Sequence, residues 1–187
     1  MVLRGKNTNA NLLISDYFKN PDDSSSILCD LTMTSKGKLL LDACKTGKLS
    51  EAKNLVSEGA NLNYAVPTSQ YTPLMAAIEH NHTEIINWLL DKDTLEVDRR
   101  NRWKNTALHY AAKYSKDGVM VARLGNRMKK DTLNMLNQDG KTAVICAVEW
   151  DGGNVRVLQG LLSITSVDFK IQDKGGRSPL DIARLVI

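Results

Sequence analysis

The sequence lacks any long apolar run. No stretch approaches the roughly 20 consecutive apolar residues that a membrane-spanning helix requires. The first residues, 1–7, contain no apolar core followed by a small-residue cleavage site, so they do not resemble a secretory signal. We therefore expect a protein that has no membrane partner and that works inside the cell, in the cytoplasm or the nucleus.

Cysteine and histidine are scarce, with three of each in 187 residues. The cysteines, Cys29, Cys44 and Cys146, are odd in number and show no paired spacing. Such usage is typical of buried thiols in a reducing compartment, not of a disulfide framework. The histidines also lack the spacing of metal ligands. We predict neither a metal site nor a cofactor.

Catalytic motifs are absent as well. The sequence contains no glycine-rich phosphate loop, no Gly-x-Ser-x-Gly elbow and no His-Glu-x-x-His pair. The adjacent carboxylates Asp22 and Asp23 lie in a polar stretch that could not hold them at a reacting bond. These residues give no reason to expect an enzyme or a small-molecule substrate.

What the sequence does contain is a four-residue phrase at near-constant spacing. Its copies begin at Thr72, Thr106, Thr142 and Ser178, so successive starts lie 34, 36 and 36 residues apart, and a degenerate copy begins at Lys38. The sixth position of every copy is alanine: Ala43, Ala77, Ala111, Ala147 and Ala183. A small residue at one helical phase permits close helix–helix approach. Units of this length cannot bury an apolar face alone, so neighbours must stack.

The phrase resembles the ankyrin repeat, in which Thr-Pro-Leu-His-x-Ala-Ala opens a short helix, followed by a turn, a helix ending in Leu-Leu and a finger loop. Residues 55–63, Leu-Val-Ser-Glu-Gly-Ala-Asn-Leu-Asn, are similar to the helix end and the finger of that pattern, and Leu89-Leu90 and Leu161-Leu162 are similar to its helix ends. The resemblance covers about residues 36–187. It implies an all-α ankyrin-repeat solenoid of stacked helix-turn-helix units with finger loops.

The repeat register predicts the domain organisation. Residues 36–69 would form a capping repeat, followed by repeats at 70–103, 104–139 and 140–175 and a truncated repeat at 176–187. Residues 1–35 are polar and turn-rich around 20–26, which indicates a flexible leader. Residues 125–130 carry an insertion that we expect to be a basic loop. Because the last repeat ends without a second helix, we expect a fragment of a longer protein, a truncated product or an array whose end meets a partner.

The resemblance also implies a function, the binding of a partner protein or peptide on the concave surface of fingers and first helices. Trp103 falls at a fingertip where the family usually has a polar residue, which makes it a candidate anchor. The alternative is that its indole folds back over its own finger. Basic residues surround it: Arg99, Arg100, Arg102 and Lys104. They favour an acidic partner. Nucleic acid is less expected, because the net charge is only +4 and aspartates alternate with these cations.

A weaker resemblance concerns the ankyrin region of the euchromatic histone-lysine methyltransferases, which reads a methylated lysine in an aromatic cage. The matching positions hold Tyr71, Ala76, Glu79 and Tyr110, so one ring of the cage is missing and much of the cation–π attraction with it. Trp150, which follows a glutamate, resembles the glutamate–aromatic pair of that region. The alternative function is thus the recognition region of a larger enzyme that reads a histone-tail lysine.

Overall fold

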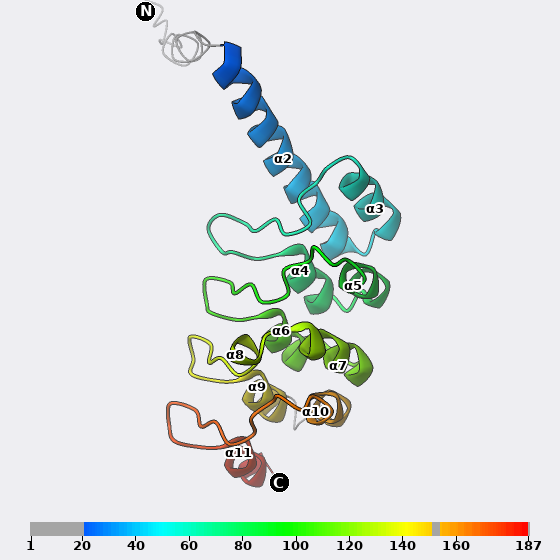
Figure 1. Cartoon of the computed structure of the whole chain (residues 1–187). Helices are drawn as coiled ribbons and strands as arrows, with labels where there is room; N and C mark the ends of the chain where they lie inside the picture. The colour runs from blue at the N-terminus through cyan, green and yellow to red at the C-terminus, as the bar shows by residue number, and fades with distance from the viewer. Residues whose placement is uncertain (1–20, 151–153, 187) are drawn as a thin grey trace, which may run out of the picture.

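The computed structural model describes residues 21–150 and 154–186, which form a stack of helix pairs (Figure 1). This part of the chain contains ten helices and no strand. They are α2 (Pro21–Thr46), α3 (Leu49–Ser57), α4 (Pro73–Glu79), α5 (Thr83–Leu90), α6 (Ala107–Tyr114), α7 (Gly118–Arg127), α8 (Lys130–Leu133), α9 (Ala143–Glu149), α10 (Val155–Leu162) and α11 (Pro179–Val186). The predicted all-α repeat solenoid is confirmed.

Each repeat contributes a first helix, a second helix and a finger. The first helices α2, α4, α6, α9 and α11 pack in that order, and α3, α5, α7 and α10 each pack beside the first helix of their own repeat. In Figure 1 the first helices form the central column, the second helices lie on one side and the loops project on the other. We call these loops finger 1 (58–72), finger 2 (91–106), finger 3 (134–142) and finger 4 (163–178).

The recurring phrase starts each first helix. The hydroxyl oxygen of Thr72 accepts a hydrogen bond from the amide of Met75, and Thr142 accepts one from Ile145 in the same way. Such N-caps satisfy amides that the helix itself leaves unbonded. The alanine at the sixth position is buried in four of the five copies and half-buried at Ala183. The first helices therefore approach one another closely, as the sequence predicts.

The N-terminal helix departs from the prediction. α2 begins at Pro21, so residues 21–35, which we expected in a flexible leader, are helical; residues 1–20 lie outside the described residues. Proline suits the first position of a helix, and aspartate is a favoured residue type in a first helical turn. The turn-forming residues of this stretch thus act as a helix start. The first half of α2 extends beyond the stack in Figure 1.

The predicted basic loop at residues 125–130 is also wrong, because α7 continues to Arg127 and α8 begins at Lys130. The guanidinium of Arg127 donates hydrogen bonds to the carbonyl oxygens of Leu90 and, at 2.9 Å, Lys92. These carbonyls lie at the C-terminus of α5, where a cation is stabilised by the helix dipole. This basic residue therefore joins two repeats.

His109 ties the third repeat to the fourth. Its Nδ1 accepts a hydrogen bond from the amide of Thr106 at 3.2 Å, and its Nε2 lies 3.1 Å from the carbonyl oxygen of Lys141 in finger 3. This arrangement fits the neutral ring with its proton on Nε2. Burial lowers the pKa of His109 to about 4. The neutral imidazole is thus part of what positions finger 3.

His109 should make stability depend on pH. Its pKa is about 4 in the folded chain against 6.5 for an ordinary histidine, so the unfolded chain binds more protons between these values. The stabilisation is complete above pH 6.5 and is lost as the pH falls towards 4, by up to about 3 kcal/mol. Urea unfolding of wild type and His109→Gln at pH 7 and pH 5 measures this. Equal losses of unfolding free energy between pH 7 and pH 5 in both proteins would contradict a role for His109. The control is His80→Gln, which alters an exposed histidine.

Two glycines set the distance between α7 and α10. A Cβ atom added to Gly118 would lie 2.1 Å from the carbonyl oxygen of Arg156, and one added to Gly160 would lie 2.2 Å from the carbonyl oxygen of Gly118. Both obstacles are backbone atoms, which cannot swing aside as a side chain would. The two second helices can keep their present separation only without these side chains.

Gly160→Ala should therefore destabilise the chain although alanine has the higher helix propensity. Propensity alone would stabilise by about 1 kcal/mol, whereas forcing an extra methyl group into a packed contact costs about 1–3 kcal/mol or more. We expect a net loss of about 1–2 kcal/mol in the free energy of unfolding. Gln159→Ala, on the exposed face of the same helix, is the control. A Gly160→Ala protein more stable than wild type would contradict the close contact.

Candidate partner-binding groove

One polar side chain closes the tip of each of fingers 2, 3 and 4. The Oδ1 atom of Asn101 accepts hydrogen bonds from the amides of Trp103 and Asn105 at 3.0 and 2.9 Å. Asn137 and Asp173 each accept two amide hydrogen bonds from the corresponding residues of their own fingers. The sequence pattern did not predict this role, although successive members of the three lie 36 positions apart and Asn and Asp are residues that favour such turns.

Neighbouring fingers are also bonded to each other. The amide of Arg102 donates to the carbonyl oxygen of Ser69 at 2.8 Å, and the amide of Gln138 donates to that of Trp103 at 2.9 Å. The ammonium of Lys174 reaches the carbonyl oxygen of Gln138 at 2.5 Å. These bonds join all four fingers into one row, which makes the surface between fingers and first helices continuous.

That surface is hollowed between the third and fourth repeats. The hollow, which we call the groove pocket, has a volume of about 320 Å³ and lies between fingers 2 and 3 and helices α6 and α9. Its lining is mixed aromatic and charged: Trp103, Asn105, His109, Tyr110, Lys113, Tyr114, Asn137, Asp139, Lys141, Cys146, Glu149 and Trp150. Trp103 is 49% exposed and Trp150 is 45% exposed. The structure therefore brings these two predicted residues to one pocket.

A row of aromatic rings leads from the second repeat to this pocket. Ring centroids lie 5.6 Å apart for Tyr71 and Tyr110, 6.0 Å for Tyr110 and Tyr114, and 5.9 Å for Tyr114 and Trp150. Tyr110 and Tyr114 share one face of α6 because they are four residues apart. Tyr114 was not among the predicted site residues, although its spacing of four from Tyr110 could have indicated it.

A lysine ammonium lies against the end of this row. The Nζ atom of Lys113 is 4.2 Å from the ring centroid of Trp150 and 5.0 Å from that of Tyr114. Both distances fall within the roughly 6 Å range of cation–π attraction. The rings therefore hold a positive charge in the groove pocket, a feature that the sequence alone did not indicate.

Two acidic side chains at or beside the pocket, Glu149 and Asp173, are paired with neighbouring cations. Glu149 pairs with the ammonium of Lys141 at 2.5 Å and lies 3.9 Å from the guanidinium of Arg177. The hydrogen bond from Lys141 to Glu149 raises the pKa of the lysine. Arg177 also binds Asp173 at 2.7 Å, and its hydrogen bonds lower the pKa of that carboxyl group. Asp139, which also lines the pocket, has no ion pair among residues 34–150 and 154–185, so the excess positive charge lies at the rim, on Arg102 and Lys104.

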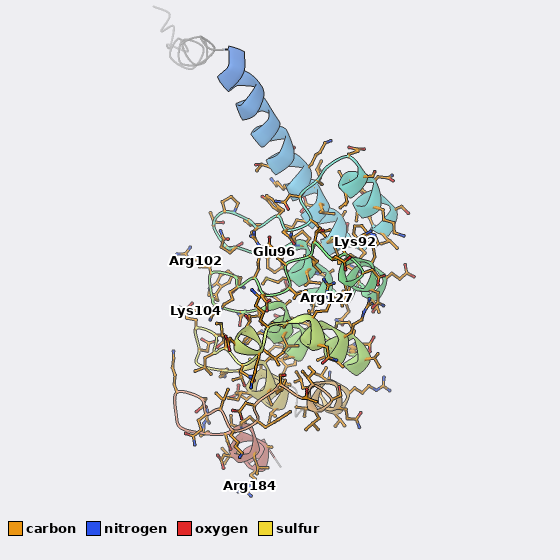
Figure 2. All side chains as sticks on the ribbon, viewed as in Figure 1. Lys92, Glu96, Arg102, Lys104, Arg127 and Arg184 are labelled. Carbon is orange, nitrogen blue, oxygen red and sulfur yellow. The ribbon has the colours of Figure 1, made fainter. Side chains whose placement is uncertain are left out.

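The basic residues predicted at finger 2 divide into two kinds. Arg99 pairs with Glu96 at 2.6 Å, and Arg100 donates hydrogen bonds to the carbonyl oxygens of Lys104 and Leu136 at 3.1 and 2.8 Å. These two guanidinium groups are part of the finger structure. Arg102 and Lys104 instead lie exposed on either side of Trp103, at the outer edge of the fingers in Figure 2.

The residues that match the lysine-reading cage form a closed network of their own. The hydroxyl of Tyr71 donates a hydrogen bond to the carboxylate of Glu79, and the side-chain amide of Asn101 donates to the hydroxyl of Tyr110 at 3.0 Å. Burial and this carboxylate raise the pKa of Tyr71, and burial raises that of Tyr110 to about 12. A lysine ammonium would have to part the two rings, so binding at this position stays a prediction.

Among the described residues, no group of three histidine, cysteine, aspartate or glutamate side chains gathers in an arrangement that could hold a metal ion. Burial raises the pKa of Cys44 to about 12 and that of Cys146 to about 11, so both thiols are protonated at neutral pH. Among the helices described, none combines the length and the apolar character needed to cross a membrane.

Comparison with known proteins agrees with this architecture. The model of a family described as ankyrin repeats (3 copies) matches residues 2–101 and 40–128. A putative ankyrin repeat protein of Fowlpox virus is 29% identical over 168 residues, which cover 83% of this chain and 46% of the viral protein. The protein lin-12 of Caenorhabditis elegans is 29% identical over 102 residues, which cover 54% of this chain and 7% of lin-12. The chain thus spans less than half the length of either relative.

Ankyrin repeats are generally non-catalytic modules that bind other proteins. The match to the family model extends over more than half of the residues, and the helix pairs, capped first helices and fingers are those that the repeat pattern predicts. This chain belongs to the ankyrin repeat family.

Proposed function

We propose that this chain binds a partner protein or peptide, without catalysis, through the groove formed by the fingers and first helices. The observation that carries the proposal is the groove pocket, in which Trp103 and Trp150 each leave nearly half of their surface in water. Tryptophan is enriched among the residues that dominate binding energy, because its large ring gains much from losing contact with water. The backbone bonds of finger 2 hold Trp103 ready for such a contact.

The charges around the pocket favour an acidic partner. Arg102 and Lys104 flank Trp103 at the fingertip, whereas Glu149 and Asp173 are already paired within the chain. A positive rim attracts an acidic surface over about 8–10 Å at physiological salt. It raises the association rate more than it raises the final affinity.

The backbone of Lys104 supports a role for this residue in binding. Lys104 has a φ of 61°, in the left-handed region, and the equivalent positions 36 and 72 residues later are Gly140 and Gly176 with φ of 76° and 74°. The left-handed conformation costs an L-residue about 1–2 kcal/mol, and glycine avoids this cost. A strained backbone conformation that is kept at a non-glycine residue points to a function. At Lys104 that function would be to place an ammonium beside Trp103.

Replacing Trp103 should separate binding from stability. Short random peptides displayed on phage can be selected on the whole chain, and the selected peptides can then be titrated against variants. Trp103→Ala should weaken binding about tenfold or more, because an anchor residue contributes about 2 kcal/mol or more. Leu162→Ala, which alters an exposed residue on α10, should leave binding unchanged. Equal affinities for wild type and Trp103→Ala would contradict the proposed anchor.

Lys104→Gly should weaken binding without weakening the fold. Glycine relieves the positive φ, while its greater freedom in the unfolded chain offsets part of that gain. We expect the free energy of unfolding to be unchanged or higher by up to about 1 kcal/mol, and the association rate with an acidic selected peptide to fall. Urea unfolding and stopped-flow association measure the two effects. A strongly destabilised variant, or one that associates as fast as wild type, would show that lysine is kept for another reason.

A further inference from the structure

We infer that the groove pocket is a subsite for a carboxylate side chain, Asp or Glu, that stands next to an apolar residue of the bound peptide. Lys113 would bind the carboxylate, and the rings of Trp103, Tyr114 and Trp150 would contact the apolar neighbour. This inference rests on the proposed function and names the chemistry that the groove recognises.

The position of Lys113 is the first support. Its ammonium is held over Trp150 and Tyr114 at 4.2 and 5.0 Å, so its charge is fixed inside the pocket instead of extending into solvent. An ammonium carries three hydrogen-bond donors, and ring faces attract the charge without supplying a lone-pair acceptor of the carboxylate kind. A partner oxygen can therefore bind Lys113 without displacing it from the rings.

The pairing of the remaining charges is the second support. Lys141 and Glu149 bind each other, and Arg177 is shared between Asp173 and Glu149. Among residues 34–150 and 154–185, no carboxylate forms an ion pair with Lys113, Arg102 or Lys104. Asp139, in the lining, is likewise without an ion pair there, so the excess positive charge lies at the tip of finger 2; that excess and the unpaired ammonium of Lys113 match an acidic segment.

The rings explain why the carboxylate needs an apolar neighbour. A volume of about 320 Å³ lies near the lower end of the roughly 300–1,000 Å³ typical of ligand pockets, and four aromatic side chains line it. A peptide side chain that covers Trp103 or Trp150 removes water from around Lys113. The ion pair then forms in a medium of lower dielectric, where the attraction is stronger than in bulk water.

A peptide selection on the whole chain tests this inference. Peptides selected from a random library on wild type should be enriched in Asp or Glu next to a large apolar residue. For a selected peptide, Lys113→Gln should weaken binding about tenfold, because a hydrogen bond between charged groups is lost. Lys116→Gln, which removes an exposed charge beyond the end of α6, is the matched control, and Lys113→Arg should retain binding.

The same peptide with Gln in place of its acidic residue completes a double-mutant cycle. If Lys113 binds that carboxylate, the two changes together should cost no more than either one alone. The peptide change measured on wild type needs no protein variant, so it still tests whether the carboxylate is recognised if circular dichroism shows that a substitution disturbs folding. Additive losses, or selected peptides without acidic residues, would overturn the subsite.

Two further outcomes separate this inference from the proposed function. Peptides that lose affinity on Trp103→Ala but depend on neither Lys113 nor a carboxylate would overturn the subsite and leave the proposed function intact. A selection in which no peptide binds at the groove would contradict both. A single-stranded oligonucleotide that displaces the selected peptides while peptides themselves show no acidic preference would also overturn the subsite, in favour of phosphate recognition.

Discussion

The close approach of successive first helices at their buried alanines is the constraint on which the rest of this structure depends. Ala77, Ala111 and Ala147 are completely buried, so a larger side chain at this helical phase would push neighbouring repeats apart. Because the helices lie this close, each finger reaches the next one. The amide of Gln138 can then bond to the carbonyl oxygen of Trp103, and Nε2 of His109 can bond to that of Lys141. The groove follows from the same spacing.

The groove takes its chemistry from side chains that the stack does not need for packing. Tyr114, Lys113 and Trp150 lie near the ends of α6 and α9, where one face of each helix turns away from the buried alanines. Contacts between repeats fix the positions of these side chains, because the ring of Trp150 in the fourth repeat packs against the ring of Tyr114 in the third. Neither repeat alone supplies both of these rings. The pocket, like the core, therefore forms only when the repeats stack.

The sequence predicted those features that repeat along the chain and missed those that depend on contacts between repeats. The Thr-Pro-Leu phrase and the alanine phase predicted helix starts and packing, because they are local and recur every 34–36 residues. Arg100 looked like a free fingertip charge, but its guanidinium binds Leu136, 36 residues away. The sequence did not indicate a role for Lys113 for the same reason, because one of the two rings that contact its ammonium, Trp150, belongs to the next repeat. At residues 21–35 the turn-forming Pro and Asp were read as a flexible segment, although these residues also start helices.

One fold can serve different partners when different atoms are responsible for packing and for recognition. Lys141 has atoms of both kinds. Its carbonyl oxygen accepts the hydrogen bond from His109 that fixes finger 3, and any residue could supply that oxygen. Its ammonium pairs with Glu149 in the groove pocket, a contact that depends on the identity of the side chain. Substitution at such a position can therefore change what the groove attracts while the backbone bond remains. In this chain buried apolar residues, helix caps and bonds between fingers specify the fold, which leaves the exposed aromatic and charged side chains of the groove free to determine the partner.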